Sequence, residues 1–110
     1  LGICYGLQLL CHTLGGKVEN ADRREYGPAR LRIDKNEQLF KGFDAGEEVE
    51  VWMSHGDKVV LLPPGFEILA HSKDSPFAAI AHRQRRMVGV QFHPEVVHTP
   101  RGLEMLQSFL

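Results

Sequence analysis

A cysteine set between two glycines carries the strongest chemical signal in the chain. Residues 2–6 read GICYG, a G-x-C-x-G pattern at the end of a short apolar segment. In the serine counterpart, G-x-S-x-G, the nucleophile sits on a strained turn between a strand and a helix. Such a turn would need both glycines, because backbone packs against backbone without room for a Cβ atom. The pattern predicts that Cys4 is a nucleophile, whereas a small buried cysteine in a glycine-rich turn is the competing interpretation.

Two properties of such a turn would help a thiol to react. The positive end of the following helix lowers the pKa of the thiol and favours the thiolate. The backbone N–H of the next residue, Tyr5, points to the place where an oxyanion would form. We therefore expect a lowered pKa at Cys4 and an oxyanion donor at Tyr5.

A histidine and a glutamate near the other end of the chain could serve as the base and its orienting group. His93 directly follows the apolar segment 87–92 and precedes Pro94 and Glu95. The rigid proline holds the two side chains in a fixed relation, so Glu95 can accept the imidazole N–H and stabilise the imidazolium. His-Pro-Glu alone is typical of a surface turn. Together with Cys4 it predicts a Cys-His-Glu triad.

Metal binding is the competing use of cysteine and histidine. Cys4, Cys11 and His12 do not fit the C-x₂-C or H-x₃-H spacings of zinc ligands. His93 with His98 forms a single weak pair. We predict no metal site. Cys11 lies on an apolar helix face, which favours a role in core packing.

The elements around Cys4 and His93 must bring them together. Residues 1–4 are typical of the end of a buried strand, and residues 5–15 carry apolar side chains on one helical face, at positions 7, 10, 11 and 14. The glycine pair at 15–16 is a natural helix stop. His93 follows a strand predicted over residues 87–92. Ligands of open α/β sheets bind outside the carboxyl ends of strands, so we expect Cys4 and His93 at such an edge.

The other segments favour short strands joined by turns. Strands are expected at residues 29–34, 49–53, 66–71 and 77–82. Loops and turns are expected at residues 17–27, 54–57, 63–65 and 83–86, with a helical turn at 39–43. In a last helix, Thr99 would be the cap and Pro100 the first residue, with one face formed by Leu103, Leu106 and Leu110. Strands mixed with helices at both ends predict an α/β fold.

The composition is that of one ordinary globular domain. The chain has 110 residues, of which 43% are hydrophobic and 25% charged, and its formal net charge is −1. No strong field attracts nucleic acid or an anionic membrane, and no apolar run reaches the roughly 20 residues of a membrane span. Two cysteines are too few for a disulfide scaffold, so we expect reduced thiols and a cytoplasmic setting. Because the chain starts inside a strand without Met and ends inside an apolar helix, we expect it to be part of a longer domain.

Several motifs together resemble one enzyme family. Residues 2–8 (GICYGLQ) and 91–95 (QFHPE) resemble the class I glutamine amidotransferases, which hydrolyse glutamine with a Cys-His-Glu triad and pass ammonia to a partner active site. Four further features resemble the GMP synthase branch of that family: Tyr5 and residues 24–27 (REYG), 52–57 (WMSHGD) and 94–99 (PEVVHT). The resemblance implies a flavodoxin-like α/β sheet with helices on both faces, here without its N-terminal strands.

The resemblance implies a catalytic role for four residues. Cys4 attacks the glutamine amide and forms a thioester. His93 activates Cys4 and protonates the leaving ammonia, while Glu95 orients His93. The backbone of Tyr5 supplies one oxyanion N–H.

The resemblance also implies the binding surfaces. Gln8 contacts the glutamine substrate, and backbone groups around Ser54 and His55 hold its α-amino and α-carboxylate groups. Four polar residues would lie near the partner domain, with solvated loop charge as the alternative interpretation: Arg24, Glu25, His55 and Asp57.

The implied partner is an ATP-pyrophosphatase domain or subunit. It would use ATP and Mg²⁺ to adenylate xanthosine monophosphate, and ammonia would displace AMP to give GMP. No cofactor is implied in residues 1–110, and a homodimer would form through the missing part. The second oxyanion donor of the family comes from a glycine-rich loop before the nucleophile strand, which this sequence lacks. We therefore predict that residues 1–110 alone are a poor glutaminase with exposed strand edges.

Three other functions stay open from the residues. The chain could belong to an amidotransferase that feeds a different synthase, although residues 54–57 (SHGD) argue against it. It could be a cysteine hydrolase of peptides or small amides, which would not require Gln8. It could also be a non-catalytic module that regulates a partner, although such modules usually lose the nucleophile or the base.

Overall fold

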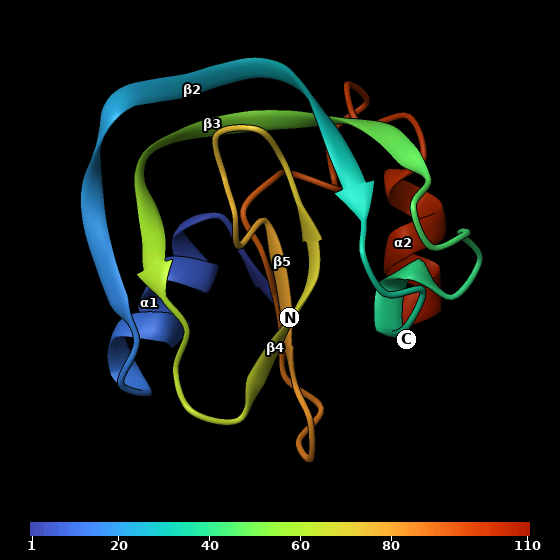
Figure 1. The fold of residues 1–110 in the computed structure, drawn as a ribbon. Coiled ribbons are helices and arrows are strands. Elements are labelled where there is room, and N and C mark those ends of the chain that lie inside the picture. Colours follow the sequence, from blue (N-terminus) through green and yellow to red (C-terminus); the bar gives the residue numbers. More distant parts are fainter.

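A six-stranded mixed sheet with helices on both faces forms the molecule (Figure 1). The computed structural model describes the backbone of residues 1–110 and the side chains of all residues except 21–23. The strand order is β1-β6-β5-β4-β2-β3. No helix in the part of the chain with described residues is long and apolar enough to cross a membrane.

The parallel part of the sheet lies at one end of this order. The strand β1 (Gly2–Ile3) pairs parallel with β6 (Val88–Val90), so that Ile3 lies opposite Val90. Next come β5 (Ala79–His82) and β4 (Phe66–His71), both antiparallel to their neighbours. Because β1 and β6 run in the same direction, the residues that follow them emerge at the same edge of the sheet.

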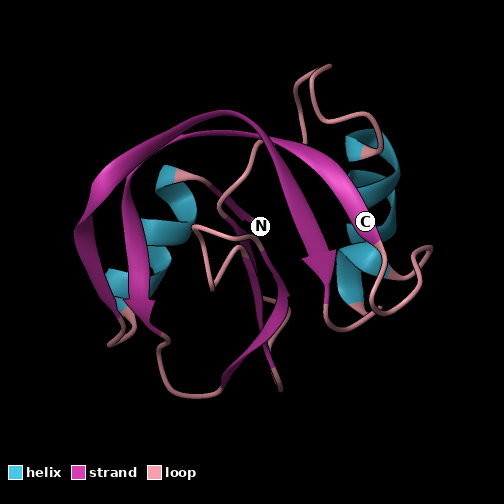
Figure 2. Cartoon of the chain, turned by 45° about the horizontal axis from the view of Figure 1, so that its top comes forward, coloured by secondary structure: helices cyan, strands magenta, loops and turns pink.

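A long antiparallel ribbon of β2 (Lys17–Ile33) and β3 (Glu48–Leu61) arches over the other end (Figures 1 and 2). The predictions of a loop at residues 17–27 and a turn at 54–57 are therefore wrong. Polar residues are accommodated because β3 alternates between buried and less buried positions through most of its length. A register shift between Asn20 and Glu25 absorbs the irregular pattern.

The other strand predictions are confirmed, with changed bounds. Residues 29–33 fall in β2 and residues 49–53 in β3, both longer than predicted, and β4 runs over Phe66–His71 as expected. The strands β5 and β6 are shorter than the predictions at 77–82 and 87–92. The helical turn predicted at 39–43 is the 3₁₀ helix η1 (Gln38–Phe40). The first helix, α1 (Tyr5–Thr13), ends before Gly15, whose φ of 98° lies in the left-handed region that glycine tolerates.

Two apolar clusters lie on opposite faces of the sheet. On one face, α1 buries Leu7 and Cys11 against side chains that include Ile80 of β5. On the other face, Ala79 and Ala81 of β5 belong to the cluster that includes η1 and α2 (Gly102–Phe109). Figure 2 shows the helices at the two sides of the sheet. Helices on both faces and the packing role of Cys11 are therefore confirmed.

The last helix differs from its prediction in both its start and its buried face. Residue Arg101 stands at the N-cap of α2, and the hydroxyl of Thr99 is engaged elsewhere. The close approach of Gly102 to Pro94 turns Met105 into the core, whereas Leu103 and Leu110 are exposed. The predicted cap at Thr99 and the face of Leu103, Leu106 and Leu110 are wrong, because the contact with Pro94 sets the rotation of the helix.

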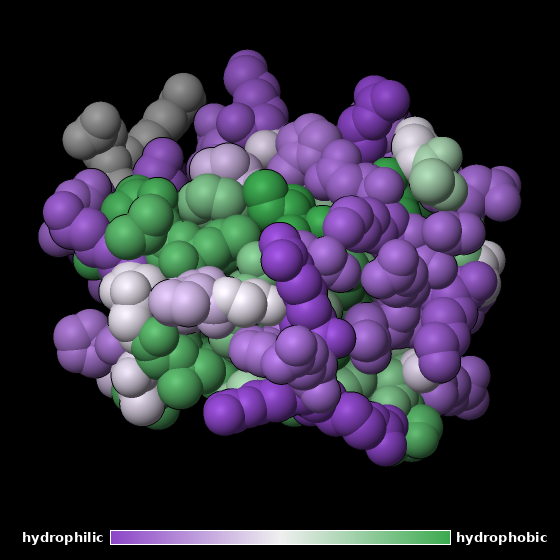
Figure 3. All heavy atoms as spheres, turned by 60° about the horizontal axis from the view of Figure 1, so that its bottom comes forward, coloured by the Kyte–Doolittle hydropathy of each residue, from purple (hydrophilic) through white to green (hydrophobic). Residues whose placement is uncertain are grey.

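Apolar side chains also reach the surface beside β1. The face drawn in Figure 3 carries apolar patches between charged side chains. Exposed apolar residues include Leu1 and Leu9, and a groove on the outer side of α1 is lined mainly by Leu9, Leu10, Leu14 and Met87. Since β1 stands at the end of the sheet order, it is an edge strand.

Candidate active site

Cys4 lies on a strained turn between β1 and α1. Its φ of 52° and ψ of −102° are in a region that few residues other than glycine adopt. Its N–H donates to the carbonyl of Val90 over 2.7 Å, which ties the turn to the end of β6. A Cβ atom on Gly2 would lie 2.9 Å from the backbone of Gly6, so Gly2 is required. A Cβ atom on Gly6 would meet nothing within 4 Å in the described chain, so the predicted need for this glycine is wrong.

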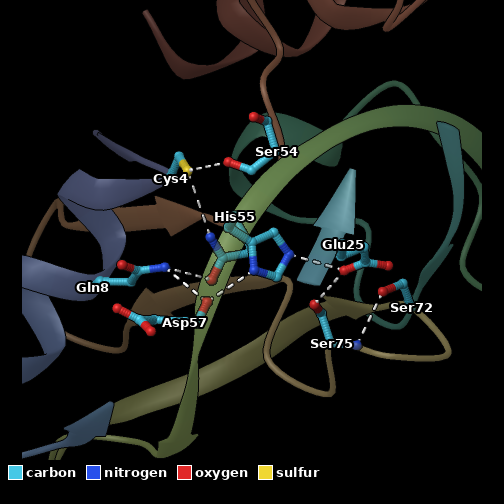
Figure 4. Close-up of polar contacts among 9 residues, drawn as sticks. Cys4, Gln8, Glu25, Ser54, His55, Asp57, Ser72 and Ser75 are labelled. Carbon is cyan, nitrogen blue, oxygen red and sulfur yellow. Dashed lines mark hydrogen bonds and ion pairs between the residues drawn. The ribbon is translucent and has the colours of Figure 1, made fainter. Parts of the chain in front are cut away.

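The sulfur of Cys4 has partners of opposite kinds (Figure 4). Its S–H donates to the carbonyl oxygen of Ser54 over 3.4 Å. The side-chain amide of Gln91 donates to the sulfur over 3.7 Å, and the backbone N–H of Tyr5 also points at it. The carbonyl favours the neutral thiol, and the two N–H groups favour the thiolate.

Burial raises the pKa of the Cys4 thiol above its ordinary value, and the N–H of Tyr5 and the amide of Gln91 lower it by less. The charge of Glu95 is near enough to raise this pKa further. The predicted lowering of the pKa is therefore wrong, because loss of hydration outweighs the donors at the start of the helix. Burial therefore favours the protonated thiol, so a nucleophilic Cys4 would need a base.

The base candidate has its orienting carboxylate in contact. The Nδ1 atom of His93 lies 2.9 Å from Oε2 of Glu95, whose side chain is 48% exposed. With its Nδ1–H donated to a carboxylate, the imidazole keeps Nε2 as the nitrogen that can accept a proton. The structure thus joins His93 and Glu95 in the arrangement that a general base needs.

Three hydrogen bonds hold His93 on β3, one of them directly and two through Thr99. Its N–H donates to the carbonyl of Trp52 over 2.9 Å. The hydroxyl of Thr99 donates to the carbonyl of His93 over 2.6 Å and accepts the N–H of Trp52 over 3.0 Å. The ring of His98 packs on Trp52 with centroids 4.5 Å apart.

The outer edge of β3 therefore serves both halves of the site. Both backbone groups of Trp52 bond away from β2, to Thr99 and His93, so they point to the outer edge of β3. Pro28, which has no N–H, is tolerated on β2 opposite this position. The backbone of Ser54, two residues further along β3, points to the same edge, and its carbonyl accepts the S–H of Cys4. Two residues of an extended strand span about 7 Å, so Cys4 and His93 are attached to neighbouring points of one strand.

A pocket of about 350 Å³ opens beside the sulfur of Cys4. Its lining unites most of the predicted site residues: Cys4, Tyr5, Gln8, Asn20, Arg24, Tyr26, Ser54, His55, Gly56 and Asp57. A larger pocket of about 430 Å³ beside α2 is lined by Glu95 but not by Cys4, so the smaller one is the candidate for substrate. Three predicted site residues, Glu25, His93 and Glu95, are outside the lining of the smaller pocket. Arg24 and Asp57 are exposed in its wall.

Gln8 and His55 meet at one carbonyl oxygen. Nε2 of Gln8 donates to the carbonyl of Asp57 over 2.9 Å, and Nδ1 of His55 lies 2.8 Å from the same oxygen (Figure 4). On its other side, Nε2 of His55 lies 2.9 Å from the carboxylate of Glu25, which also accepts the hydroxyl of Ser75 over 3.0 Å.

These contacts fix the charge of Glu25. The hydrogen bond from His55 holds the pKa of Glu25 below its usual range, so Glu25 is ionised. The imidazole of His55 lies between the carbonyl of Asp57 and this carboxylate. His55 is only 3% exposed and Glu25 only 15%, so the pair is engaged inside the chain. The backbone of Ser54 and His55 remains at the pocket.

Sequence reasoning missed the functional contacts of Gln91, Trp52 and Thr99. Gln91 could have been found as a lone amide in an otherwise apolar strand, since a buried polar group needs partners. Nothing in the local pattern marks Thr99 or Trp52 as fastening points of His93. No group of three His, Cys, Asp or Glu side chains that could hold a metal ion occurs among the residues with described side chains.

The family model described as "Glutamine amidotransferase class-I" matches residues 1–110. The chain belongs to the class I glutamine amidotransferases. Its fold supports this membership. A crystal structure from Thermoplasma acidophilum that is named for a GMP synthase has a TM-score of 0.91 at 32% identity, covering 97% of this chain and 53% of that one. A glutamine amidotransferase from Thermotoga maritima has a TM-score of 0.74 at 26% identity, covering 94% of this chain and 43% of that one.

Two similar curated proteins carry the same name. GMP synthase [glutamine-hydrolyzing] of Aquifex aeolicus is 57% identical over 110 residues, and the protein of that name from Brachyspira hyodysenteriae is 48% identical. Both alignments cover 100% of this amidotransferase chain and 21% of the relative, so the chain spans about a fifth of their length. The resemblance to the GMP synthase branch and the flavodoxin-like fold class are confirmed.

Proposed function

We propose that this chain provides the glutamine-hydrolysing site of a GMP synthase. Cys4, His93 and Glu95 act as nucleophile, base and orienting carboxylate, and the ammonia released aminates xanthosine monophosphate. The observation that carries the proposal is the attachment of Cys4 and His93 to Ser54 and Trp52 on one edge of β3. The shared name of the relatives supports the acceptor.

The reaction would proceed in two halves. Nε2 of His93 takes the proton of Cys4, and the sulfur attacks the side-chain amide carbon of glutamine while the N–H of Tyr5 stabilises the oxyanion. The imidazolium returns its proton to the departing nitrogen, so that ammonia leaves and a γ-glutamyl thioester remains. A water molecule deprotonated by His93 then attacks the thioester, and glutamate leaves as the thiol is restored.

The pocket beside Cys4 would hold the substrate. The amide nitrogen of Gln8 is engaged with the carbonyl of Asp57, so the contact of Gln8 with glutamine would come from its carbonyl oxygen. Backbone groups around Ser54 and His55 would hold the α-amino and α-carboxylate groups. The buried pair of His55 and Glu25 supports this segment from behind.

An ATP-pyrophosphatase domain or subunit would receive the ammonia. The exposed Arg24 and Asp57 in the pocket wall suit a contact with this partner. The partner would bind ATP and Mg²⁺. Residence in the cytoplasm fits two cysteines that are both free thiols. Formation of a homodimer stays a prediction.

The experiment that tests this function uses the full-length protein. Wild type should form GMP from xanthosine monophosphate and ATP with either glutamine or ammonia as the nitrogen source. The variant Cys4→Ala should lose the reaction with glutamine and keep the reaction with ammonia. Glutamine-dependent synthesis by Cys4→Ala would point to a non-catalytic module, and ammonia consumed only with another acceptor would point to a different synthase.

A further inference from the structure

Gln91 is a polar side chain buried where an apolar strand ends. It directly follows β6, precedes the buried Phe92, and is only 1% exposed. Burying an amide is costly unless its hydrogen bonds are made. The partners of this amide therefore indicate why a glutamine stands here.

Those partners form a relay that ends on the nucleophile. Nε2 of Gln8 donates to the carbonyl of Asp57 over 2.9 Å and to Oε1 of Gln91 over 3.5 Å. The amide oxygen of Gln91 faces the amide NH₂ group of Gln8. The NH₂ group of Gln91 is therefore turned to Cys4, and its Nε2 lies 3.7 Å from the sulfur. Figure 4 shows Gln8 directed at the carbonyl of Asp57 and the sulfur of Cys4 between two contacts.

The contacts of the sulfur with Ser54 and Gln91 act on opposite protonation states. The carbonyl of Ser54 can only accept, so it stabilises the thiol that donates to it. The amino group of Gln91 can only donate, so its contact strengthens when the sulfur becomes an anion. When the proton passes to Nε2 of His93, the Ser54 contact is lost, the electron pair stays on sulfur, and the Gln91 contact remains.

We propose that Gln91 is a catalytic residue that stabilises the thiolate of Cys4, and that Gln8 is a positioning residue that orients the Gln91 amide. The proposal rests on the proposed glutaminase function for its reaction. The contact with the sulfur itself is a property of the fold. The hydrogen bond from Gln91 would thereby offset part of the cost that burial imposes on the thiolate of Cys4.

Other charged side chains lie around Cys4, including Arg24 and Asp57 in the lining of the same pocket. Glu95 and His93 follow β6, and their contact does not involve Gln91. In the antiparallel pair β2–β3, His55 of β3 is in contact with Glu25 of β2. A change in the ionisation of Cys4 on substitution of Gln91 therefore reports the lost amide donor rather than a rearranged charge.

The test follows alkylation of Cys4 by iodoacetamide against pH in the full-length protein, with peptide mass spectrometry that reports Cys4 and Cys11 separately. Gln91→Met keeps the length of the side chain and removes its donor. A hydrogen bond to a charged group is typically worth about a tenfold factor or more. We expect the midpoint of Cys4 alkylation to rise by about one pH unit in Gln91→Met. The matched control Gln84→Met, on the exposed tip between β5 and β6, should leave the midpoint unchanged.

Kinetics separate this role from simple packing. With glutamine as substrate, Gln91→Met should lower kcat about tenfold and leave KM within about twofold, because the donor acts on the nucleophile. Gln8→Met should raise the alkylation midpoint in the same direction by a smaller amount. An unchanged midpoint in a folded Gln91→Met protein would overturn the proposal.

A second variant keeps the test decisive if Gln91→Met does not fold. In that case the midpoint of Gln8→Met decides, and an unchanged value overturns the relay. Alkylation needs no glutamine, so its outcome is independent of the proposed function. A shifted midpoint in a protein that hydrolyses no glutamine would contradict the glutaminase and leave the thiolate contact standing.

Discussion

Cys4 and His93, the proposed nucleophile and base, are held in place by different means. The conformation of Cys4 is set by its neighbours in sequence, since its φ of 52° in the turn of residues 2–6 leaves the thiol at the start of α1. His93 is fixed by a distant residue, Trp52 on β3, both directly and through the hydroxyl of Thr99, six residues further along the chain. A short motif can thus encode a nucleophile, whereas a base on a loop depends on tertiary contacts.

The surroundings of the two halves differ as well. The thiol of Cys4 is partly buried, and this burial raises its pKa. The carboxylate that orients His93 is half in solvent. A thiol whose ionisation is disfavoured by burial is therefore paired with a histidine whose orienting carboxylate is in solvent, and the proposed chemistry depends on how firmly β3 holds Cys4 and His93.

The largest expected effect comes from removing the base. His93→Ala should lower glutamine hydrolysis by about 10²- to 10⁴-fold, the usual contribution of a general base. Residues that act as a unit are not additive, so Cys4→Ala with His93→Ala should be no worse than Cys4→Ala alone. Steady-state assays of glutamate release by the full-length protein measure both. A further loss in the double variant would show that the two side chains act separately.

The next effect comes from loosening the base without removing it. Thr99→Val deletes the hydroxyl that joins the carbonyl of His93 to the N–H of Trp52 and leaves both groups without that partner. The loss of about 1–3 kcal/mol should appear in the free energy of unfolding, together with a roughly tenfold lower kcat. Thr99→Ser keeps the hydroxyl and should retain most of the activity. Equal kcat values for the two variants would remove Thr99 from the set of residues that position the base.

A smaller effect tests the local geometry of the nucleophile. Gly2→Ala places a methyl group against the backbone of Gly6 and should destabilise the fold by about 1–3 kcal/mol. Gly6→Ala meets open space within a helix and should be neutral or stabilising by up to about 1 kcal/mol. Thermal or denaturant unfolding measures the difference. The reverse order of stabilities would contradict the strained turn.

The smallest effect concerns the second cysteine, which lies in the core. Burial raises the pKa of Cys11 from 9.0 to about 11. A raised value in the folded state favours the neutral thiol, so its contribution to stability is present below pH 9 and is lost between pH 9 and 11. The free energy of unfolding should therefore fall by about 1–2 kcal/mol more across that window in wild type than in Cys11→Val. Identical pH profiles would exclude ionisation of Cys11 as a cause.

Local patterns predicted the parts of the fold that depend on neighbouring residues. The turn at Cys4, the helix after it and its glycine stop all follow from steric and capping rules that act within a few residues. Period-two alternation likewise predicted a strand at residues 29–34, of which residues 29–33 lie in β2. The joint position of Cys4 and the His93 segment followed from placing both at strand ends.

Pairing across the chain decided what the sequence did not predict. Residues 17–27 are polar, and they form a strand only because β3 supplies hydrogen-bonding partners along most of their length. The face of α2 was mispredicted because the contact of Gly102 with Pro94 sets its rotation. The raised pKa of Cys4 depends on burial, which no local motif reports.

The most direct test of the joint action of Cys4 and His93 is covalent labelling of the full-length protein by diazo-oxo-norleucine, an electrophile that mimics glutamine. We expect one label on Cys4, protection by glutamine, and labelling slowed about a hundredfold in His93→Ala, because the thiol needs that base to ionise. Labelling of Cys4 at the same rate in His93→Ala, or no labelling of Cys4 at all, would contradict the claim that the two residues act together on the edge of β3.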